Sequence, residues 1–150
     1  MNFEINDPNY ENRVRESFSK QKLMETIGAR LTKVLPGEVE ISLPFRDDLT
    51  QQHAFIHAGI VATIADTACG YAAFSLMAPD SAVLTVEYKI NLLSPAVGES
   101  LVAHGRVKKP GRTVTVCSAD VFAFKKGEKK LVATMLATIM SILGREGLVG

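Results

Sequence analysis

The pattern of hydrophobic and polar residues predicts helices in the first half of the chain and mainly strands in the second. An amphipathic helix is predicted over about residues 8–27, because Asp7 and Pro8 are typical of a helix start and Gly28 of a stop. A long buried helix is predicted over residues 58–77, where nearly every face is apolar. Six strands are predicted over residues 29–35, 38–45, 82–93, 99–108, 112–124 and 130–143. The resulting order is helix, two strands, long helix and four strands.

This order of elements places the chain in the α+β class. The last four strands are expected to form an antiparallel meander, and small side chains on the long helix leave room for a sheet to approach it closely. These small residues are Gly59, Ala62, Ala65, Ala68, Gly70, Ala72 and Ala73. A sheet wrapped around one central helix is the hotdog arrangement, which is the fold we expect. No linker or internal repeat is visible, so residues 1–150 are expected to form a single domain.

Composition and charge argue against several classes of protein. The 150 residues include 17 Lys and Arg, 16 Asp and Glu and no Trp, so we expect no nucleic-acid partner. The first residues include acids and lack the apolar segment of a secretory signal. The apolar run 60–78 contains Asp66 and lacks basic flanks, so we expect a buried helix and no membrane span. Cys69 and Cys117 fit no zinc-binding spacing, and a cytoplasmic location is the simplest interpretation.

Asp66 is the only formally charged residue of the run 60–78. Burying an unpaired carboxylate is costly, so this side chain is expected to be paired, protonated or open to a cleft. One interpretation is an Asp satisfied by neighbouring hydroxyl groups at a helix contact. The other is a catalytic carboxylate whose pKa is shifted by its surroundings. Taken alone, the residue leaves both interpretations open.

The start of the long helix is a second candidate for chemistry. The backbone N–H groups of Ala58 and Gly59 are expected to lack acceptors within the helix and to lie at its positive end, where they could bind an oxyanion. Asp66 lies eight residues further on, about 12 Å along the axis. Reacting groups must come within roughly 3–3.5 Å of one another. If both ends serve one reaction, they come from different subunits, and we expect a two-fold dimer with two equivalent sites at its interface.

Three sequence segments carry a resemblance to a known family. They are HAGIVATIADTACGYAA, LTVEYKINLLSPAVGE and KKPGRTVTV, in that order. Over about residues 30–142 the chain resembles the hotdog-fold acyl-CoA thioesterases, and within them the phenylacetate-degradation (PaaI-type) and 4-hydroxybenzoyl-CoA thioesterase groups. The motif combines a His-small-Gly run, an Asp nine residues after the His, and a later Ser-Pro-Ala turn. One departure is the alanine at position 58, where the family usually has glycine; a backbone donor survives this change at a helix start.

The resemblance implies a role for each matching residue. Asp66 corresponds to the family's acidic residue, which acts either as nucleophile or as general base, and the sequence does not decide between these roles. The Ala58 N–H is expected to polarise the thioester carbonyl, and Gln51 occupies the place of an amide side chain that assists at that carbonyl or at the nucleophile. Thr85 matches a hydroxyl residue that can orient the attacking water. His57 matches the family histidine, which is expected to shape the helix entrance by hydrogen bonding.

The resemblance also suggests where the coenzyme A portion of a substrate would bind. Arg112 follows a Pro-Gly turn at a place where related thioesterases often carry a basic residue near coenzyme A, and Ser94-Pro95 resembles the turn beside the pantetheine arm. Coenzyme A would be part of the substrate, and we expect no separate cofactor. We also expect no metal, because a regular helix separates His57 from Asp66.

The function expected from these features is hydrolysis of acyl-CoA or aryl-CoA thioesters by an Asp-dependent cytoplasmic homodimer, which can pair further into a homotetramer. Two alternatives stay open. A non-catalytic acyl-CoA-binding hotdog protein would bind the thioester in the same cleft without cleaving it. A hotdog hydratase or dehydratase would act on the acyl chain, although such enzymes pair a catalytic His with an acid at a different spacing.

Overall fold

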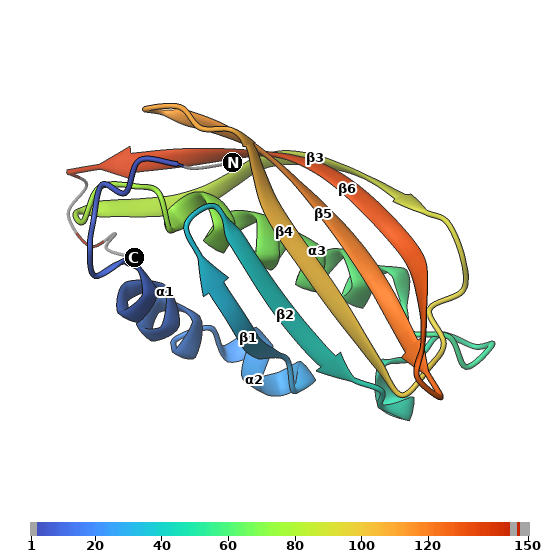
Figure 1. Cartoon of the computed structure of the whole chain (residues 1–150). Helices are drawn as coiled ribbons and strands as arrows, with labels where there is room; N and C mark the ends of the chain where they lie inside the picture. Colours follow the sequence, from blue (N-terminus) through green and yellow to red (C-terminus); the bar gives the residue numbers. More distant parts are fainter. Residues whose placement is uncertain (1–2, 145–146, 148–150) are drawn as a thin grey trace.

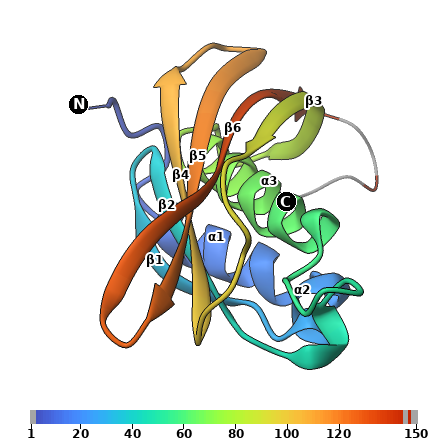
Figure 2. The ribbon, with the colours of Figure 1, turned by 90° about the vertical axis from the view of Figure 1, so that its right-hand side faces the viewer.

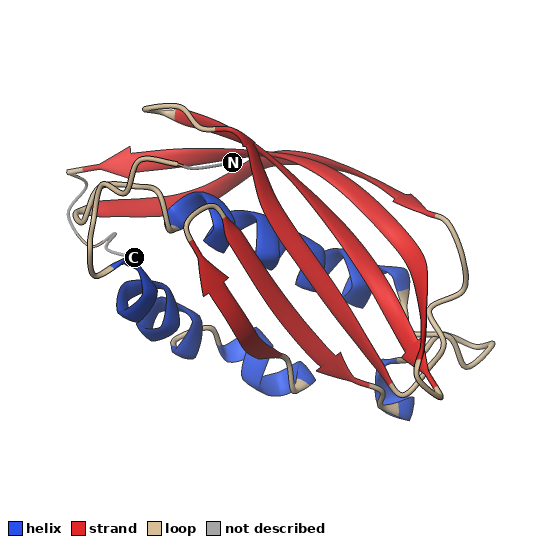
Figure 3. Cartoon of the chain, in the orientation of Figure 1, coloured by secondary structure: helices blue, strands red, loops and turns tan. Residues whose placement is uncertain are grey.

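The computed structural model of the protein describes residues 3–144 and residue 147. Three α-helices, one 3-10 helix and six strands are found in this part of the chain (Figure 1, Figure 3). In chain order they are α1 (Tyr10–Ser19), α2 (Lys22–Ile27), β1 (Arg30–Leu35), β2 (Glu38–Pro44), η1 (Asp47–Leu49), α3 (Ala58–Phe74), β3 (Ser81–Leu92), β4 (Ser100–Lys109), β5 (Val114–Lys125) and β6 (Glu128–Leu143).

The six strands form one antiparallel sheet that curves around α3, and Figure 2 shows this helix inside the curve. Period-two alternation decides which side chains meet the helix: along β2, Val39 and Ile41 are fully buried, whereas Glu38 and Glu40, which alternate with them, face outward. The predicted α+β hotdog fold is therefore confirmed. No helix within the described residues is long and apolar enough to cross a membrane.

Small residues let the sheet approach α3, as the sequence indicated. One close approach is at Gly105 of β4, where an added Cβ would lie 2.4 Å from the backbone carbonyl of Ala68. Ala65, Ala68 and Cys69 of α3 are fully buried on this side. Any side chain at position 105 would push the central strand away from the helix, so this glycine fixes the distance between the two layers.

The expected meander of four strands is wrong in one respect. The strand order is β1-β2-β4-β5-β6-β3, so β4, β5 and β6 form a meander, but β3 pairs with β6 and lies at the edge. The space beside β4 is taken by β2. Periodicity identifies a strand but not its partner, and the connection after β3 is long enough to cross the end of the sheet before β4 begins.

The single N-terminal helix predicted over residues 8–27 is divided into α1 and α2. Asn9 occupies the N-cap position of α1, and the backbone changes direction at Gln21, which has an extended conformation (φ −77°, ψ 100°). This break changes the helical phase, so Met24 is buried but Leu23 is 52 % exposed. The end at Gly28, which has the left-handed conformation, is as predicted.

Candidate functional site

The start of α3 is capped by a side chain. His57 is the N-cap residue, and its Nδ1 accepts a hydrogen bond of 2.9 Å from the Gly59 N–H. The Gly59 N–H is therefore already used, which corrects the expectation that it is free for a ligand. Within residues 3–144, no group accepts a hydrogen bond from the Ala58 N–H. The free donor at the positive end of α3 is thus the one at position 58.

A tight loop before α3 orients the amide of Gln51. Its backbone N–H donates to the Phe55 carbonyl at 2.8 Å, and the Ala54 N–H donates back to the Gln51 carbonyl at 3.0 Å. The loop closes through Ala54 at φ 60°, a conformation in which a non-glycine residue is uncommon. The His53 N–H donates to the side-chain Oε1 of Gln51. The Nε2 end of the amide therefore stays available as a donor.

Gln51 and Ala58 line the same cavity, which we call the donor half-site. Its volume is about 380 Å³. Its lining includes both residues of the Ser94-Pro95 turn and is otherwise mainly apolar: Phe55, Ile56, Val61, Leu92, Leu93, Ala96 and Val132. The structure thus brings together four of the residues that the sequence singled out, two for polarising a carbonyl and two for the pantetheine arm.

Asp66 and Thr85 form a second group, which we call the acid half-site. The Thr85 hydroxyl donates to Asp66 Oδ1 at 2.8 Å, so strand β3 supplies the hydrogen-bond partner of the helix carboxylate. Burial raises the pKa of the Asp66 carboxyl above its ordinary value, and the hydrogen bond from Thr85 partly offsets this by lowering it. The carboxyl lines a cavity of about 270 Å³ and is therefore accessible to a ligand.

A β-bulge in β3 decides which side chains reach this cavity. The pairing with β6 shifts between Thr85 and Glu87, so Val86 is the extra residue. Before the bulge, Val83 and Thr85 line the cavity; after it, Tyr88 does. Glu87 lies on the other face, where its carboxylate accepts a hydrogen bond from Thr138. The bulge therefore keeps a second carboxylate away from Asp66 and places a tyrosine ring there instead.

The two half-sites share no lining residue. Ala58 and Asp66 lie eight residues apart on a regular helix, about 12 Å along its axis. Arg112 lies in neither half-site. It lines a third cavity, of about 440 Å³, together with Ala73 from the C-terminal end of α3. Within one chain, the candidate residues are thus assembled into three separate groups.

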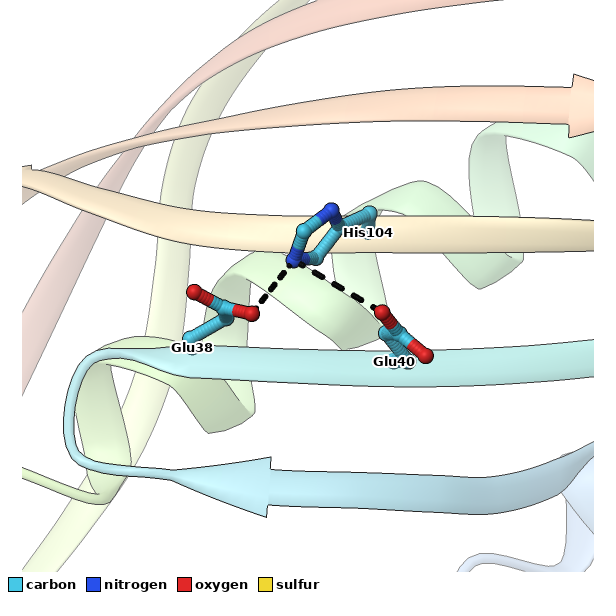
Figure 4. A group of neighbouring side chains, drawn as sticks. All are labelled: Glu38, Glu40 and His104. Carbon is cyan, nitrogen blue, oxygen red and sulfur yellow. Dashed lines mark ion pairs between the residues drawn. The ribbon is translucent and has the colours of Figure 1, made fainter.

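A further cluster of titratable side chains lies on the outer face of the sheet (Figure 4). His104 Nε2 is 2.8 Å from Glu38 Oε1 and 3.9 Å from Glu40 Oε1. Lys33 Nζ contacts the same Glu38 oxygen at 2.7 Å, and Arg106 donates to His104 Nδ1 at 2.7 Å. Since guanidinium only donates, the imidazole proton lies on Nε2 and faces the carboxylate. Lys33 already pairs with Glu38, and Arg106 already occupies His104 Nδ1, so the cluster is a hydrogen-bonded ion-pair network and not an open set of metal ligands.

Two cysteines contribute to the core and not to the site. Cys69 lies one turn beyond Asp66 on α3, and Cys117 lies on β5; both are free thiols and fully buried. Burial raises the pKa of Cys117 to about 12 and that of Cys69 further still. Neither thiol forms a thiolate near neutral pH, so Cys69 is a small core residue and not a nucleophile.

Comparison with known proteins identifies the family. Residues 53–130 match the model of the thioesterase superfamily, and the chain belongs to this superfamily. A thioesterase family protein from Silicibacter pomeroyi, known from a crystal structure, is 54 % identical in sequence. Its TM-score is 0.89, and the match covers 90 % of this chain and 99 % of that one. Human acyl-coenzyme A thioesterase 13 is 26 % identical over 125 residues, or 80 % of this chain and 86 % of that protein.

The same fold occurs in more distant relatives. The PaaI protein of Escherichia coli, from the phenylacetic acid degradation operon, is 19 % identical, with a TM-score of 0.80 over 91 % of this chain and 95 % of that one. The resemblance predicted from the sequence is thereby confirmed. By its family, the protein is a thioester hydrolase.

Proposed function

We propose that the protein hydrolyses acyl-CoA thioesters at two equivalent sites, each formed where two copies of the chain meet. The observation that carries this proposal is the separation of the donor and acid half-sites into distinct cavities on one chain. A carbonyl bound to the Ala58 N–H lies too far from Asp66 of the same chain to react with it. A complete site therefore needs the donor half-site of one copy and the acid half-site of another.

Edge strand β3 supports the way in which two copies meet. This strand is long and lies at the edge of the sheet, and the side chains of Leu84, Val86 and Tyr88 on it are 44–56 % exposed. Such an edge is a template for another strand, and antiparallel pairing of β3 with its own copy is two-fold symmetric. Pairing centred near Tyr88 would put Thr85 beside the partner subunit's Leu92, which lines the donor half-site. The acid of each copy would then face the donors of the other.

The chemistry follows from the groups that this pairing brings together. The thioester oxygen would accept hydrogen bonds from the Ala58 N–H and from Gln51 Nε2 of one copy, which stabilise the negative charge that develops there. Ionised Asp66 of the other copy either takes a proton from an attacking water or attacks the carbonyl carbon itself. In both routes the bond to sulfur breaks, coenzyme A leaves as its thiol, and the acyl group leaves as a carboxylic acid after water is added.

The same pairing would assemble the coenzyme A contacts. Ser81 begins β3 and lines the cavity that contains Arg112, whereas Leu92 ends β3 next to Ser94-Pro95. Antiparallel pairing would therefore bring Arg112 of one copy towards the partner subunit's Ser94. We propose that the turn holds the pantetheine arm and that the guanidinium binds a phosphate. Free, buried Cys69 and Cys117 agree with a reduced, cytoplasmic setting for this enzyme.

Thiol release tests the reaction class. Acyl-CoA is mixed with the protein, and free coenzyme A is measured with a thiol reagent while enoyl products are followed by absorbance. We expect thiol release without enoyl formation. Tight binding without thiol release would instead indicate a non-catalytic acyl-CoA-binding protein, and enoyl formation or consumption would indicate a hydratase or dehydratase.

Mixing two inactive variants tests the shared site. Gln51→Ala and Asp66→Asn are each purified, unfolded together and refolded. A mixed dimer has one site with both defects and one site with neither, so we expect about a quarter of wild-type activity to return. Each variant refolded alone is the control. If the mixture stays inactive although light scattering shows dimers or tetramers, the site lies within one chain and the proposal is wrong.

A further inference from the structure

The acid half-site extends beyond Asp66 along α3. Gly70 lies four residues further on the same helix face and lines the same cavity. A Cβ built at Gly70 would meet no heavy atom within 4 Å outside the local helix backbone. This glycine is therefore not required by packing, and the space above it is open to a ligand that lies next to the carboxyl.

One side of this space is formed by Gln21 and Leu23, and we call this side the wall. Gln21, at the break between α1 and α2, and Leu23 both line the cavity together with Tyr71. Gln21 Nε2 donates to the Tyr71 hydroxyl at 2.9 Å, and Ser17 Oγ lies 3.2 Å from the same hydroxyl. Because Tyr71 is 3 % exposed, its ring is fixed in the core and holds the Gln21 amide in place.

The wall is fixed to the end of α3. Arg13 of α1 donates to the Phe74 carbonyl at 3.1 Å and to the Met77 carbonyl at 2.8 Å, and its guanidinium lies 4.4 Å from the centre of the Phe74 ring. Asp7 pairs with the same guanidinium at 3.0 Å. Buried charge-assisted contacts of this kind hold an element in one position. The N-terminal helices thus act as a fixed boundary of the cavity.

We propose that the acyl group of the substrate lies over Gly70 and ends at the Gln21–Tyr71 pair, so that the enzyme is selective for short acyl groups; this inference rests on the function proposed above. The cavity of about 270 Å³ lies just below the usual range of ligand sites, which is about 300–1,000 Å³. A long apolar chain would have to displace the Gln21 amide from Tyr71, or bury its Oε1, which accepts no hydrogen bond from the described residues; both are unfavourable. Gly70 sets the width of the acyl site and Gln21 its length.

A series of straight-chain thioesters tests this assignment. We expect kcat/KM for acetyl-, butyryl- and hexanoyl-CoA to exceed that for dodecanoyl-CoA. Gly70→Leu should shift the preference to acetyl-CoA, because the added carbons occupy the acyl space, and should lower the hexanoyl-to-acetyl ratio of kcat/KM at least about tenfold. Gly70→Ala should lower the same ratio by a smaller factor. Gln21→Ala should act in the opposite direction and raise the dodecanoyl-to-butyryl ratio about tenfold. Ser19→Ala, on α1 and outside the cavity, is the matched control and should leave the ratios unchanged.

The outcomes separate this inference from the proposed function. If no acyl-CoA releases thiol, the proposed function is wrong and the acyl assignment falls with it. If thiol is released but Gly70→Leu and Gln21→Ala keep the wild-type ratios, the reaction stands and the acyl group binds elsewhere. Should Gly70→Leu fail to fold, Gly70→Ala and Gln21→Ala still decide the question, since equal ratios in both would overturn the assignment.

Discussion

The donor and acid half-sites are built by different means. In the donor half-site the backbone supplies one donor, the N–H at the first residue of α3, and a loop N–H orients the other, the Gln51 side-chain amide. The acid half-site depends on one carboxyl side chain, whose ionisation is controlled by burial and by the Thr85 hydroxyl. Most substitutions of a residue keep its backbone N–H donor, whereas almost every substitution of Asp66 removes the carboxylate. Under the proposed mechanism, alanine could therefore replace glycine at position 58, whereas position 66 would require an acid.

The two half-sites also differ in their effect on the stability of the folded state. His57 caps the start of α3, so the donor half-site coincides with an ordinary stabilising feature of a helix. At the acid half-site, a half-buried carboxylate lies in an otherwise apolar helix and has a raised pKa. In such a group the ionised form is disfavoured by the folded state. If both half-sites act as proposed, catalytic function and stability agree at the donor half-site and conflict at the acid half-site, which variants can test.

The largest effect is expected from Asp66→Asn. Loss of the base or nucleophile should lower kcat about 10²–10⁴-fold, which a thiol-release assay measures. The variant should also be more stable at neutral pH. Because the folded state raises the pKa of Asp66, wild type loses stability as pH rises from the ordinary carboxyl pKa through the raised one, and Asn does not.

Thermal unfolding at several pH values and fixed protein concentration checks the second part of this prediction. The Tm of Asp66→Asn minus that of wild type should be larger at pH 8 than at pH 4. Equal differences at both pH values would mean that the carboxyl is not destabilised by burial. Unchanged turnover would remove Asp66 from the mechanism.

The next largest effect is expected from Ala58→Pro, which tests the donor half-site. Proline is well tolerated at the first position of a helix, and His57 before it already has the extended backbone (φ −58°, ψ 138°) that a following proline needs. The substitution therefore removes the N–H donor without removing the helix. We expect kcat to fall about 10²–10³-fold while Tm changes little.

Ala58→Val is the matched control for this prediction, because it adds similar bulk but keeps the N–H. If both variants lose activity equally, the loss comes from crowding of the cavity and the donor has no role. If Ala58→Pro alone is impaired, the backbone nature of the donor half-site is established.

The sequence was sufficient for the parts of the fold that local patterns determine. The run of small and apolar residues in α3 and the alternation in β2 and β5 each specify an element and its buried face. The pairing of β3 with β6 could not be predicted, because it joins residues about fifty positions apart and neither strand carries a signal for its partner. The break at Gln21 was also hidden, since no glycine or proline marks it.

The same limit applies to the site. Asp66 stood out as a lone charge in an apolar run, and Thr85 followed from the family resemblance. The bulge at Val86 was not visible: read as regular alternation, the strand would turn Glu87 towards the helix and Tyr88 away from it, which is the reverse of what is found. Gln21 and Leu23 were missed because they reach the cavity from a helix far away in the chain.

Thr85→Val is expected to have a smaller effect, and one that depends on pH. The variant keeps the shape of the side chain but removes the hydrogen bond that lowers the pKa of Asp66. The pKa should rise further, so that the acidic limb of kcat/KM moves to higher pH, and activity near pH 7 should fall more than activity at pH 9. Thr67→Val, which changes another hydroxyl residue of the same cavity, is the control. A uniform loss at all pH values would assign Thr85 to water binding and not to tuning the carboxyl.

His57→Ala is expected to have the smallest effect on turnover and an appreciable one on stability. Losing the cap of α3 should lower the free energy of unfolding by about 1 kcal/mol, and His57→Asn, which can also cap, should retain most of it. Because the Ala58 N–H stays in place, kcat should change by only a few fold, unlike in Ala58→Pro. Denaturant unfolding and thiol release on the same preparations measure both quantities. A loss of activity as large as that of Asp66→Asn, with stability unchanged, would make His57 a catalytic group and would end the view that the donor half-site acts through its backbone.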